Sequence, residues 1–316
     1  MAVQARPATG VRPRAGLRVV DLKGMVMKRL LLSLLLLACA PACLALAPYV
    51  SGASLPAADL PAQVATVAQK LQAAGFTVIG RHLPPGIPTN ATVVVTDPGI
   101  VEAIGKVGGS AIAAAALRVG VRADGSVSYM NPEYWHRAFV RARFDQVQAA
   151  VKAAQARLVQ ALGEGQPFGG DVDTADLASY RYMFGMERFD SDNSLLASHT
   201  SFDEALASVR ANLAKGTADT TRVYEVVMPD RKIAVFGVAM NSADSGEGWW
   251  VNRIDGAAHV AALPYELFVV DNKVYALYAR FRIALAWPEL GMGQFMRIMN
   301  APNAIQDIMT RVASKP

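Results

Sequence analysis

Residues 117–130, LRVGVRADGSVSYM, form the pattern of a β-hairpin and decide the fold class of this chain. Apolar residues alternate with other residues in Leu117–Val121 and again in Val127–Met130, which is the period-2 pattern of a strand with one buried face. Between them, Asp124-Gly125 is a dipeptide that tolerates the positive φ angles of a tight type I′ turn. The stretch therefore predicts an antiparallel pair in a half-buried sheet.

The segments around this hairpin predict a first α+β unit over residues 60–163. Apolar residues at helical spacing precede two short strands and a short helix, and a long helix follows the hairpin. The predicted helices are Val64–Ala74, Gly99–Val107 and Phe144–Leu162, and the predicted strands before the hairpin are Phe76–Ile79 and Thr92–Thr96.

The same order of elements returns over residues 201–316. Ser201 and Glu204 have the spacing of a capping box, which starts a helix by satisfying its first backbone N–H groups. The long apolar alternation of Lys273–Trp287 predicts one extended strand with Arg280 and Arg282 on its outer face. The other predicted elements are the strands Arg222–Val227, Ile233–Met240 and Tyr265–Val270, a hairpin turn at Asp271-Asn272, a short segment Trp249–Arg253 and a C-terminal helix Gly293–Ala313 with a break near Pro302.

These patterns predict an α+β fold made of two tandem copies of a helix–strand–strand–helix–hairpin–helix unit. Each copy is expected to form a mostly antiparallel sheet covered by helices, and residues 164–200, which are rich in turn residues, are expected to link the copies.

In this element order, both copies resemble the domain-of-unknown-function family 302, whose members are exported and uncharacterised. In the first copy the resemblance lies in residues 71–76 and 117–131, and in the second copy in residues 201–213 and 265–286. The resemblance implies a compact α+β fold. It implies no activity and no catalytic residue.

The N-terminal region has the pattern of a secretory signal over residues 25–47. Lys28 and Arg29 precede the apolar run Leu30–Leu37, which is far shorter than the roughly 20 residues that span a bilayer as a helix. Small residues follow, so the pattern predicts an exported protein, periplasmic or secreted. Two alternatives stay open: a lipid anchor, because a lipobox-like stretch ends at Cys39, and an uncleaved membrane anchor. Residues 1–24 are interpreted as an over-extended start or a disordered basic arm.

Charge and cysteine content support this division of the chain. Seven of the 31 Lys and Arg residues and one of the 26 Asp and Glu residues precede residue 46, which leaves 24 basic against 25 acidic residues after it. The remaining part carries no excess of positive charge, and nucleic acid is therefore not expected as a partner. Both cysteines, Cys39 and Cys43, lie in the signal region, so neither disulfides nor thiolate chemistry are expected in the mature chain.

No catalytic motif stands out, and no catalytic residue or cofactor is predicted. Aromatic rings beside arginines occur at matched places in the two copies and suit an anionic or aromatic ligand, although sealing the core is the alternative for the first cluster. The candidate ligand-binding residues are Tyr134, Trp135, His136, Arg137, Trp249, Trp250 and Arg253.

Two further groups of residues are candidates for contacts. Met292, Met296 and Met299 recur on one helical face; thioethers suit Cu(I), and core filling is the alternative. Arg280 and Arg282 are expected either to face solvent or to contact an acidic partner.

The sequence thus predicts an exported binding module for an unknown small ligand, held in the cleft between the copies, rather than an enzyme. Two alternatives stay open. One is an envelope structural or assembly factor that contacts an envelope protein, and the other is a hydrolase-like enzyme that uses His136 or His259. The membrane is expected to be involved only through the signal or a lipid anchor.

Overall fold

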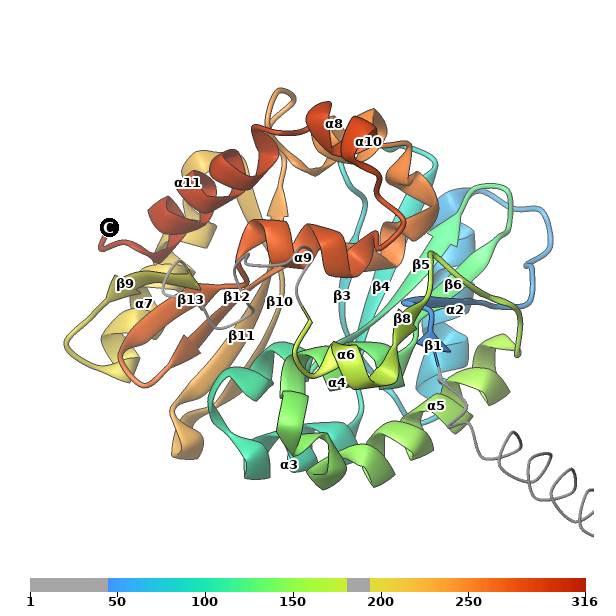
Figure 1. Ribbon diagram of the computed structural model, residues 1–316, viewed down its shortest axis with the longest axis horizontal. Coiled ribbons are helices and arrows are strands. Elements are labelled where there is room, and N and C mark those ends of the chain that lie inside the picture. Colours follow the sequence, from blue (N-terminus) through green and yellow to red (C-terminus); the bar gives the residue numbers. More distant parts are fainter. Residues whose placement is uncertain (1–44, 181–193) are drawn as a thin grey trace, which may run out of the picture. The chain divides into compact units, whose positions relative to one another are not determined.

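The chain folds into antiparallel sheets flanked by helices, which confirms the predicted α+β class (Figure 1). The computed structural model describes residues 45–180 and 194–316. The predicted extension 1–24, both cysteines and the predicted signal peptide up to residue 44 lie outside these ranges.

The first sheet has six strands in the order β3-β4-β5-β6-β2-β7. Its hairpin forms as predicted: Val119 lies opposite Tyr129, and Gly125 in the turn has a φ of 86°. The strands are β2 (Tyr49–Ser51), β3 (Thr77–His82), β4 (Asn90–Thr96), β5 (Leu117–Arg122), β6 (Val127–Met130) and β7 (Pro167–Phe168).

The second sheet has five strands in the order β10-β11-β12-β13-β9. The strands are β9 (Leu195–Ser198), β10 (Thr220–Met228), β11 (Ile233–Met240), β12 (Tyr265–Val270) and β13 (Lys273–Ala276). A separate two-stranded ribbon pairs β1 (Ala45–Leu46) with β8 (Val172–Asp173). The predicted linker 164–200 therefore contributes β7 to the first sheet and β9 to the second.

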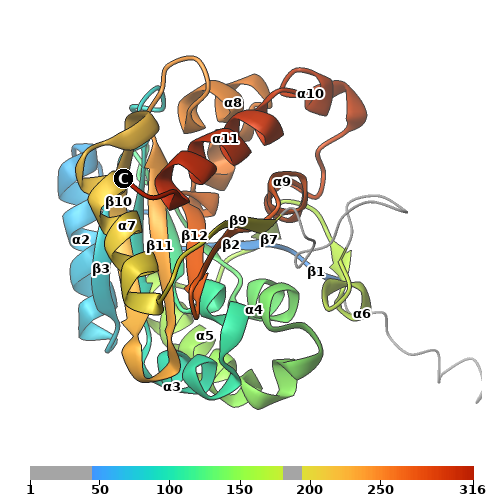
Figure 2. The ribbon, with the colours of Figure 1, turned by 90° about the vertical axis from the view of Figure 1, so that its left-hand side faces the viewer.

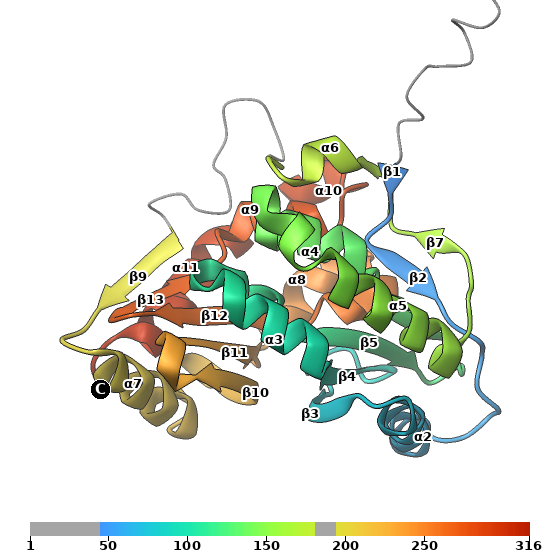
Figure 3. The same ribbon diagram turned by 90° about the horizontal axis from the view of Figure 1, so that it is seen from below.

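Helices connect and cover these strands. In the first half they are α2 (Leu60–Ala73), α3 (Pro98–Val107), η1 (Gly109–Ala114), α4 (Pro132–Val140), η2 (Arg141–Gln146), α5 (Gln148–Leu162) and α6 (Thr174–Leu177). In the second half they are α7 (Phe202–Ala214), η4 (Thr217–Asp219), η5 (Pro229–Arg231), α8 (Glu247–Arg253), η6 (Gly256–Ala262), α9 (Ala279–Ala286), α10 (Met292–Met296) and α11 (Ala301–Ala313). Helices α3, α4 and α5 lie together (Figure 3), and α7 packs beside α11 (Figure 2).

The central strands are buried on both faces because each sheet is covered from both halves of the chain. In the first sheet, β4 is packed between α2 and η6, and in the second sheet β11 is packed between α7 and η1. Every residue of β4 and of β11 is buried as a result. Side-chain hydrogen bonds between the two halves also hold this packing. Thr92 Oγ1 on β4 donates to the Val260 carbonyl oxygen on η6 at 2.9 Å. Both sheets belong to one compact unit, Leu44–Pro316.

The predicted strand Lys273–Trp287 is wrong beyond Ala276, because residues 279–286 form the helix α9. Six of the eight residues of α9 are buried, so the helix has neighbours on nearly all sides. A helix of this kind lacks the polar stripe that makes a period of 3.6 visible in a sequence. The apolar alternation of this segment therefore indicated a strand where the structure has a helix.

Three predicted helices also differ from the structure at their ends. The helix predicted over Val64–Ala74 begins earlier, at Leu60. The helix predicted from Phe144 begins at Gln148, after the 3-10 turn η2. The predicted C-terminal helix Gly293–Ala313 is two helices, α10 and α11, and the break between them lies just before Ala301, near Pro302 as predicted. Pro302 occupies the first turn of α11, where its missing N–H group costs nothing.

Candidate functional site

A buried ion-pair cluster joins the two halves at the centre of the fold. Arg118 on β5 donates from Nη1 to Glu266 Oε1 on β12, and Arg282 on α9 donates from Nε to Glu266 Oε2 at 2.7 Å. The side chains of Arg118, Glu266 and Arg282 are 1%, 0% and 2% exposed, so all three groups are removed from water. The Trp135 ring lies below both guanidinium groups, at 5.4 Å from Arg118 and 4.8 Å from Arg282.

This cluster corrects the prediction that Arg282 contacts a partner. The prediction placed Arg282 on the outer face of a strand, but the residue lies on α9 and turns inward to Glu266. Arg280 is half-buried on the same helix. The cluster acts as a clamp between β5, β12 and α9.

The first predicted aromatic cluster lies in the core, as its alternative interpretation expected. Tyr134 and Trp135 are both 0% exposed. The Tyr134 hydroxyl donates to the Leu285 carbonyl oxygen at 2.8 Å, and Trp135 Nε1 donates to the Pro48 carbonyl oxygen at 2.9 Å. Because these side chains are sealed from solvent, they are corrected from ligand-binding candidates to core residues.

The neighbours of this aromatic pair are also engaged within the protein. Arg137 pairs with Glu133 at 2.6 Å and lies over the Phe144 ring at 4.2 Å. His136 is 1% exposed and its Nδ1 lies 2.7 Å from the Pro132 carbonyl oxygen, so it is not accessible to a substrate. Burial lowers the pKa of His136 to about 4, although hydrogen bonds to backbone groups act in the opposite direction.

This pKa predicts an acid-sensitive fold. Between about pH 6.5 and about pH 4 the unfolded chain binds a proton on His136 that the folded chain does not bind. The free energy of unfolding is therefore expected to fall as the pH is lowered through this window. Urea unfolding at pH 7 and pH 4.5 measures the loss, which is expected to be smaller in the His136→Gln variant. An unchanged pH dependence in that variant would contradict the assignment.

A second buried pair, which the sequence did not indicate, ties β3 to α8. His82 Nε2 lies 2.5 Å from Glu247 Oε2, and Glu247 is 0% exposed. The backbone N–H of Tyr265 donates to the other carboxylate oxygen at 3.3 Å. This pair holds the start of α8 against the first half of the chain, and Glu247 directly precedes Gly248, which lines the pocket described next.

Helix α8 carries the second predicted cluster and presents part of it to a pocket. Trp250 is buried, with its ring edge-to-face against Trp287 at 5.1 Å. Trp249 and Arg253 instead line a cavity of about 310 Å³, here called the Trp249 pocket. The structure thus keeps these two as ligand candidates and corrects Trp250 to a core residue. The lining residues are Pro85 and Gly86 from the first half and Asn241, Ser242, Ala243, Gly248, Trp249, Asn252 and Arg253 from the second.

Two glycines allow the halves to meet at this pocket. A Cβ atom on Gly248 would lie 2.0 Å from the Pro85 carbonyl oxygen, so only glycine permits this approach of the backbones. Gly86 has a φ of 83°, which also favours glycine, and its carbonyl oxygen accepts a hydrogen bond from Asn252 Nδ2 at 2.8 Å. One wall of the pocket therefore depends on a contact between residues 166 positions apart.

The Trp249 pocket has the chemistry of an anion site. The Arg253 guanidinium lies over the Trp249 ring, 4.3 Å from its centroid. Arg253 is the one charged side chain among the lining residues, and the other polar side chains are those of Asn241, Ser242 and Asn252. One guanidinium nitrogen, Nη1, donates to the Trp249 carbonyl oxygen at 3.5 Å. The remaining N–H groups, which lie in the plane of the guanidinium, are available to an acceptor.

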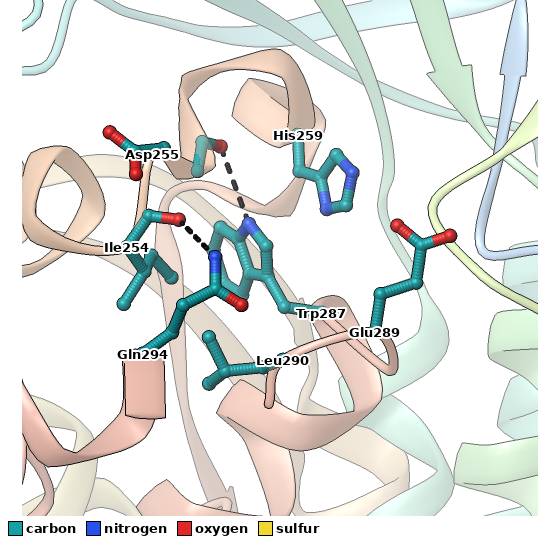
Figure 4. A pocket seen from close by; sticks show the side chains of 8 residues that line it. Ile254, Asp255, His259, Trp287, Glu289, Leu290 and Gln294 are labelled. Carbon is teal, nitrogen blue, oxygen red and sulfur yellow. Dashed lines mark hydrogen bonds between the residues drawn. The ribbon is translucent and has the colours of Figure 1, made fainter. Parts of the chain in front are cut away.

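On the other side of the α8–η6 turn lies a second cavity, of about 230 Å³, here called the His259 pocket (Figure 4). His259 stacks on Trp287 with ring centroids 5.8 Å apart, and its Nδ1 lies 3.1 Å from the Ala286 carbonyl oxygen. Burial lowers the pKa of His259, and the hydrogen bond to Ala286 opposes this only in part. The remaining lining residues are Ile254, Asp255, Gly256, Glu289, Leu290 and Gln294.

The methionine group is on the surface. Met292, Met296 and Met299 are 59%, 55% and 54% exposed, which corrects the alternative that they fill the core. The Cu(I) interpretation of these residues remains a prediction. Within residues 45–180 and 194–316, no group of three or more His, Cys, Asp or Glu side chains is arranged to hold a metal ion.

Comparisons with known protein families, with characterised proteins and with solved structures find no match for this chain. The resemblance to family 302 therefore stays a prediction. Among the described residues, no helix has both the length and the apolar character needed to cross a membrane.

Proposed function

We propose that this chain is a non-catalytic binding module that holds a small ligand in the Trp249 pocket. The observation that carries the proposal is the stacked pair of Trp249 and Arg253 in a cavity that both halves of the chain line. Ligand sites favour concave places between structural units, where few polar groups converge on an apolar surface.

The pocket favours a small ligand with a flat apolar part and a negative charge. Its volume of about 310 Å³ is at the lower end of the range for ligand sites. The Trp249 ring offers an apolar face, and Arg253 offers charge-assisted hydrogen bonds. The side-chain amides of Asn241 and Asn252 add further polar groups at the wall.

The charge requirement gives a direct test with benzoate and its uncharged isostere benzamide. We expect isothermal titration calorimetry to show tighter binding of benzoate, and Arg253→Gln to weaken it about tenfold through loss of a charged hydrogen bond. Arg231→Gln is the matched control, because Arg231 is exposed and lies outside the lining. Equal binding of both probes, or an unchanged affinity in Arg253→Gln, would refute this site.

Native mass spectrometry of the protein purified from its producing cell addresses the natural ligand. A mass added to the folded chain and absent from Trp249→Ala is the expected result. An added mass that persists in that variant would place the ligand elsewhere.

The hydrolase alternative is narrowed to one of its two histidines. His136 is sealed in the core, which leaves His259 as the accessible histidine of the two that were considered. A hydrolase of this kind would use His259 with a remote acid to activate water, and Glu289 lines the same pocket. The binding proposal therefore rests on the Trp249 and Arg253 pair and not on the absence of a histidine–acid pair.

We further propose that the two halves are tandem copies of one unit and that the protein is exported. In each half a strand precedes a helix, two strands, a helix with a 3-10 turn, a hairpin and further helices. The two sheets share one strand order apart from β7, which is an additional edge strand of the first sheet. This shared order supports the tandem-copy proposal. Export rests on the signal pattern of residues 25–47.

A further inference from the structure

The polar groups that line the His259 pocket accept hydrogen bonds. His259 keeps its Nε2 lone pair, because Nδ1 faces the Ala286 carbonyl oxygen and therefore carries the proton of the neutral ring. Glu289 is exposed and forms no ion pair among the described residues. The donors of the lining are occupied: Trp287 Nε1 donates to the Gly256 carbonyl oxygen, and Gln294 Nε2 donates to the Ile254 carbonyl oxygen.

The formal charge of this lining is negative. Asp255 and Glu289 are its charged side chains, and no Lys or Arg lines the cavity. Asp255 is partly balanced by Arg297 outside the lining, with their closest atoms 3.5 Å apart and both side chains more than half exposed. Glu289 therefore provides the uncompensated charge, and Figure 4 shows its carboxylate extending toward the His259 ring.

Two glycines bring the backbone against these groups. Gly169 and Gly170 follow β7 with φ angles of 96° and 92°. A Cβ on Gly169 would lie 3.2 Å from His259 Cε1, and a Cβ on Gly170 would lie 2.6 Å from Glu289 Cγ. The chain thus bends in a conformation that other residues rarely adopt at the place where it closes around His259 and Glu289.

We propose that the His259 pocket is a second ligand site and that it takes a small ammonium or guanidinium compound. The cation is held by the Glu289 carboxylate, donates to His259 Nε2 and lies against the Trp287 ring. Cations bind to aromatic faces and to carboxylates by the same electrostatic attraction, so these groups act together. The site is separate from the proposed function, because the Trp249 pocket has a cationic lining and selects the opposite charge.

The test uses butylammonium as the probe and 1-butanol as its uncharged control. In protein with ¹³C-labelled histidine, the ring signal of His259, assigned with His259→Gln, is expected to shift on titration with butylammonium at millimolar concentration and to stay unchanged with 1-butanol. We expect Glu289→Gln to weaken butylammonium binding about tenfold, because it removes the charge and keeps the shape.

Two variants separate the site from general electrostatic attraction. Glu164→Gln removes an exposed carboxylate outside the pocket and is expected to leave the affinity unchanged. Asp255→Asn is expected to weaken binding less than about fivefold, because the Asp255 carboxylate is exposed and already pairs with Arg297. Equal losses in Glu164→Gln and Glu289→Gln, or equal shifts with both probes, would overturn the proposal. Benzoate binding in the Trp249 pocket is expected to be unaffected by Glu289→Gln, so the two sites fail independently.

Discussion

Replacing Glu266 with Gln is expected to lower the free energy of unfolding by about 3–5 kcal/mol. The change leaves Arg118 and Arg282 with two positive charges and no counter-charge in a place that water does not reach. Removing one member of a buried ion pair is costly because the remaining charge stays desolvated and unpaired. Urea unfolding followed by circular dichroism measures the loss.

The chain offers a matched control on its surface. Glu225 also lies between two arginines, at 2.9 Å from Arg210 and 2.6 Å from Arg222, but both arginines are more than 40% exposed. Solvent screens such pairs, so Glu225→Gln is expected to cost less than about 1 kcal/mol. Similar losses in the two variants would show that burial does not set the strength of the central cluster.

The stability that the Arg118–Glu266–Arg282 cluster contributes is also expected to depend on pH. Burial alone would raise the pKa of Glu266, but the charges of Arg118 and Arg282 outweigh it, and the pKa lies below its ordinary value. The carboxylate therefore stabilises the fold fully above the ordinary Glu pKa of about 4.3, and this contribution is lost as the pH falls through the folded pKa. Below pH 4.3 the stability of Glu266→Gln is expected to decrease less steeply than that of the parent chain.

The cluster shows which parts of the fold the sequence predicts and which it does not. Both hairpin turns were visible, because Asp124-Gly125 and Asp271-Asn272 act locally on the backbone. The pairing of Arg118 with Glu266 spans 148 positions and leaves no local pattern. The helix α9 was missed for a related reason, since contacts from other parts of the chain bury most of its residues.

The candidate site also has a part that the sequence predicts and a part that it does not. Trp249 and Arg253 lie one helical turn apart, so their stacking was predictable from spacing. The opposite wall at Pro85 and Gly86 comes from the other half of the chain, and only the fold brings it there. Tyr134-Trp135 and Trp249-Trp250 are both adjacent aromatic pairs near an arginine, and the sequence alone did not show that only Trp249 among these four reaches a pocket.

Tyr49→Ala is the second variant for which a large loss is expected, about 3–5 kcal/mol of unfolding free energy. Tyr49 is 0% exposed on β2, which is paired with β6 on one side and with β7 on the other. Its ring lies 4.8 Å from His259 and 5.5 Å from Phe168. Removing the Tyr49 ring therefore opens a cavity where β2 contacts both halves of the chain.

Tyr49→Phe separates the ring from the hydroxyl. The Tyr49 hydroxyl donates to the Ala286 carbonyl oxygen at 3.0 Å, and losing this bond is expected to cost about 1 kcal/mol. A loss in Tyr49→Phe as large as in Tyr49→Ala would show that the hydrogen bond, and not packing, fixes β2. Under the proposal that the chain is exported, a signal cut is expected to leave both Pro48 and Tyr49 in the mature chain, because the Pro48 carbonyl oxygen and the Tyr49 side chain are part of the core. A mature chain that begins at Leu46 is then expected to be as stable as the parent, whereas one that begins at Gly52 lacks β2 and is expected to lose at least as much stability as Tyr49→Ala.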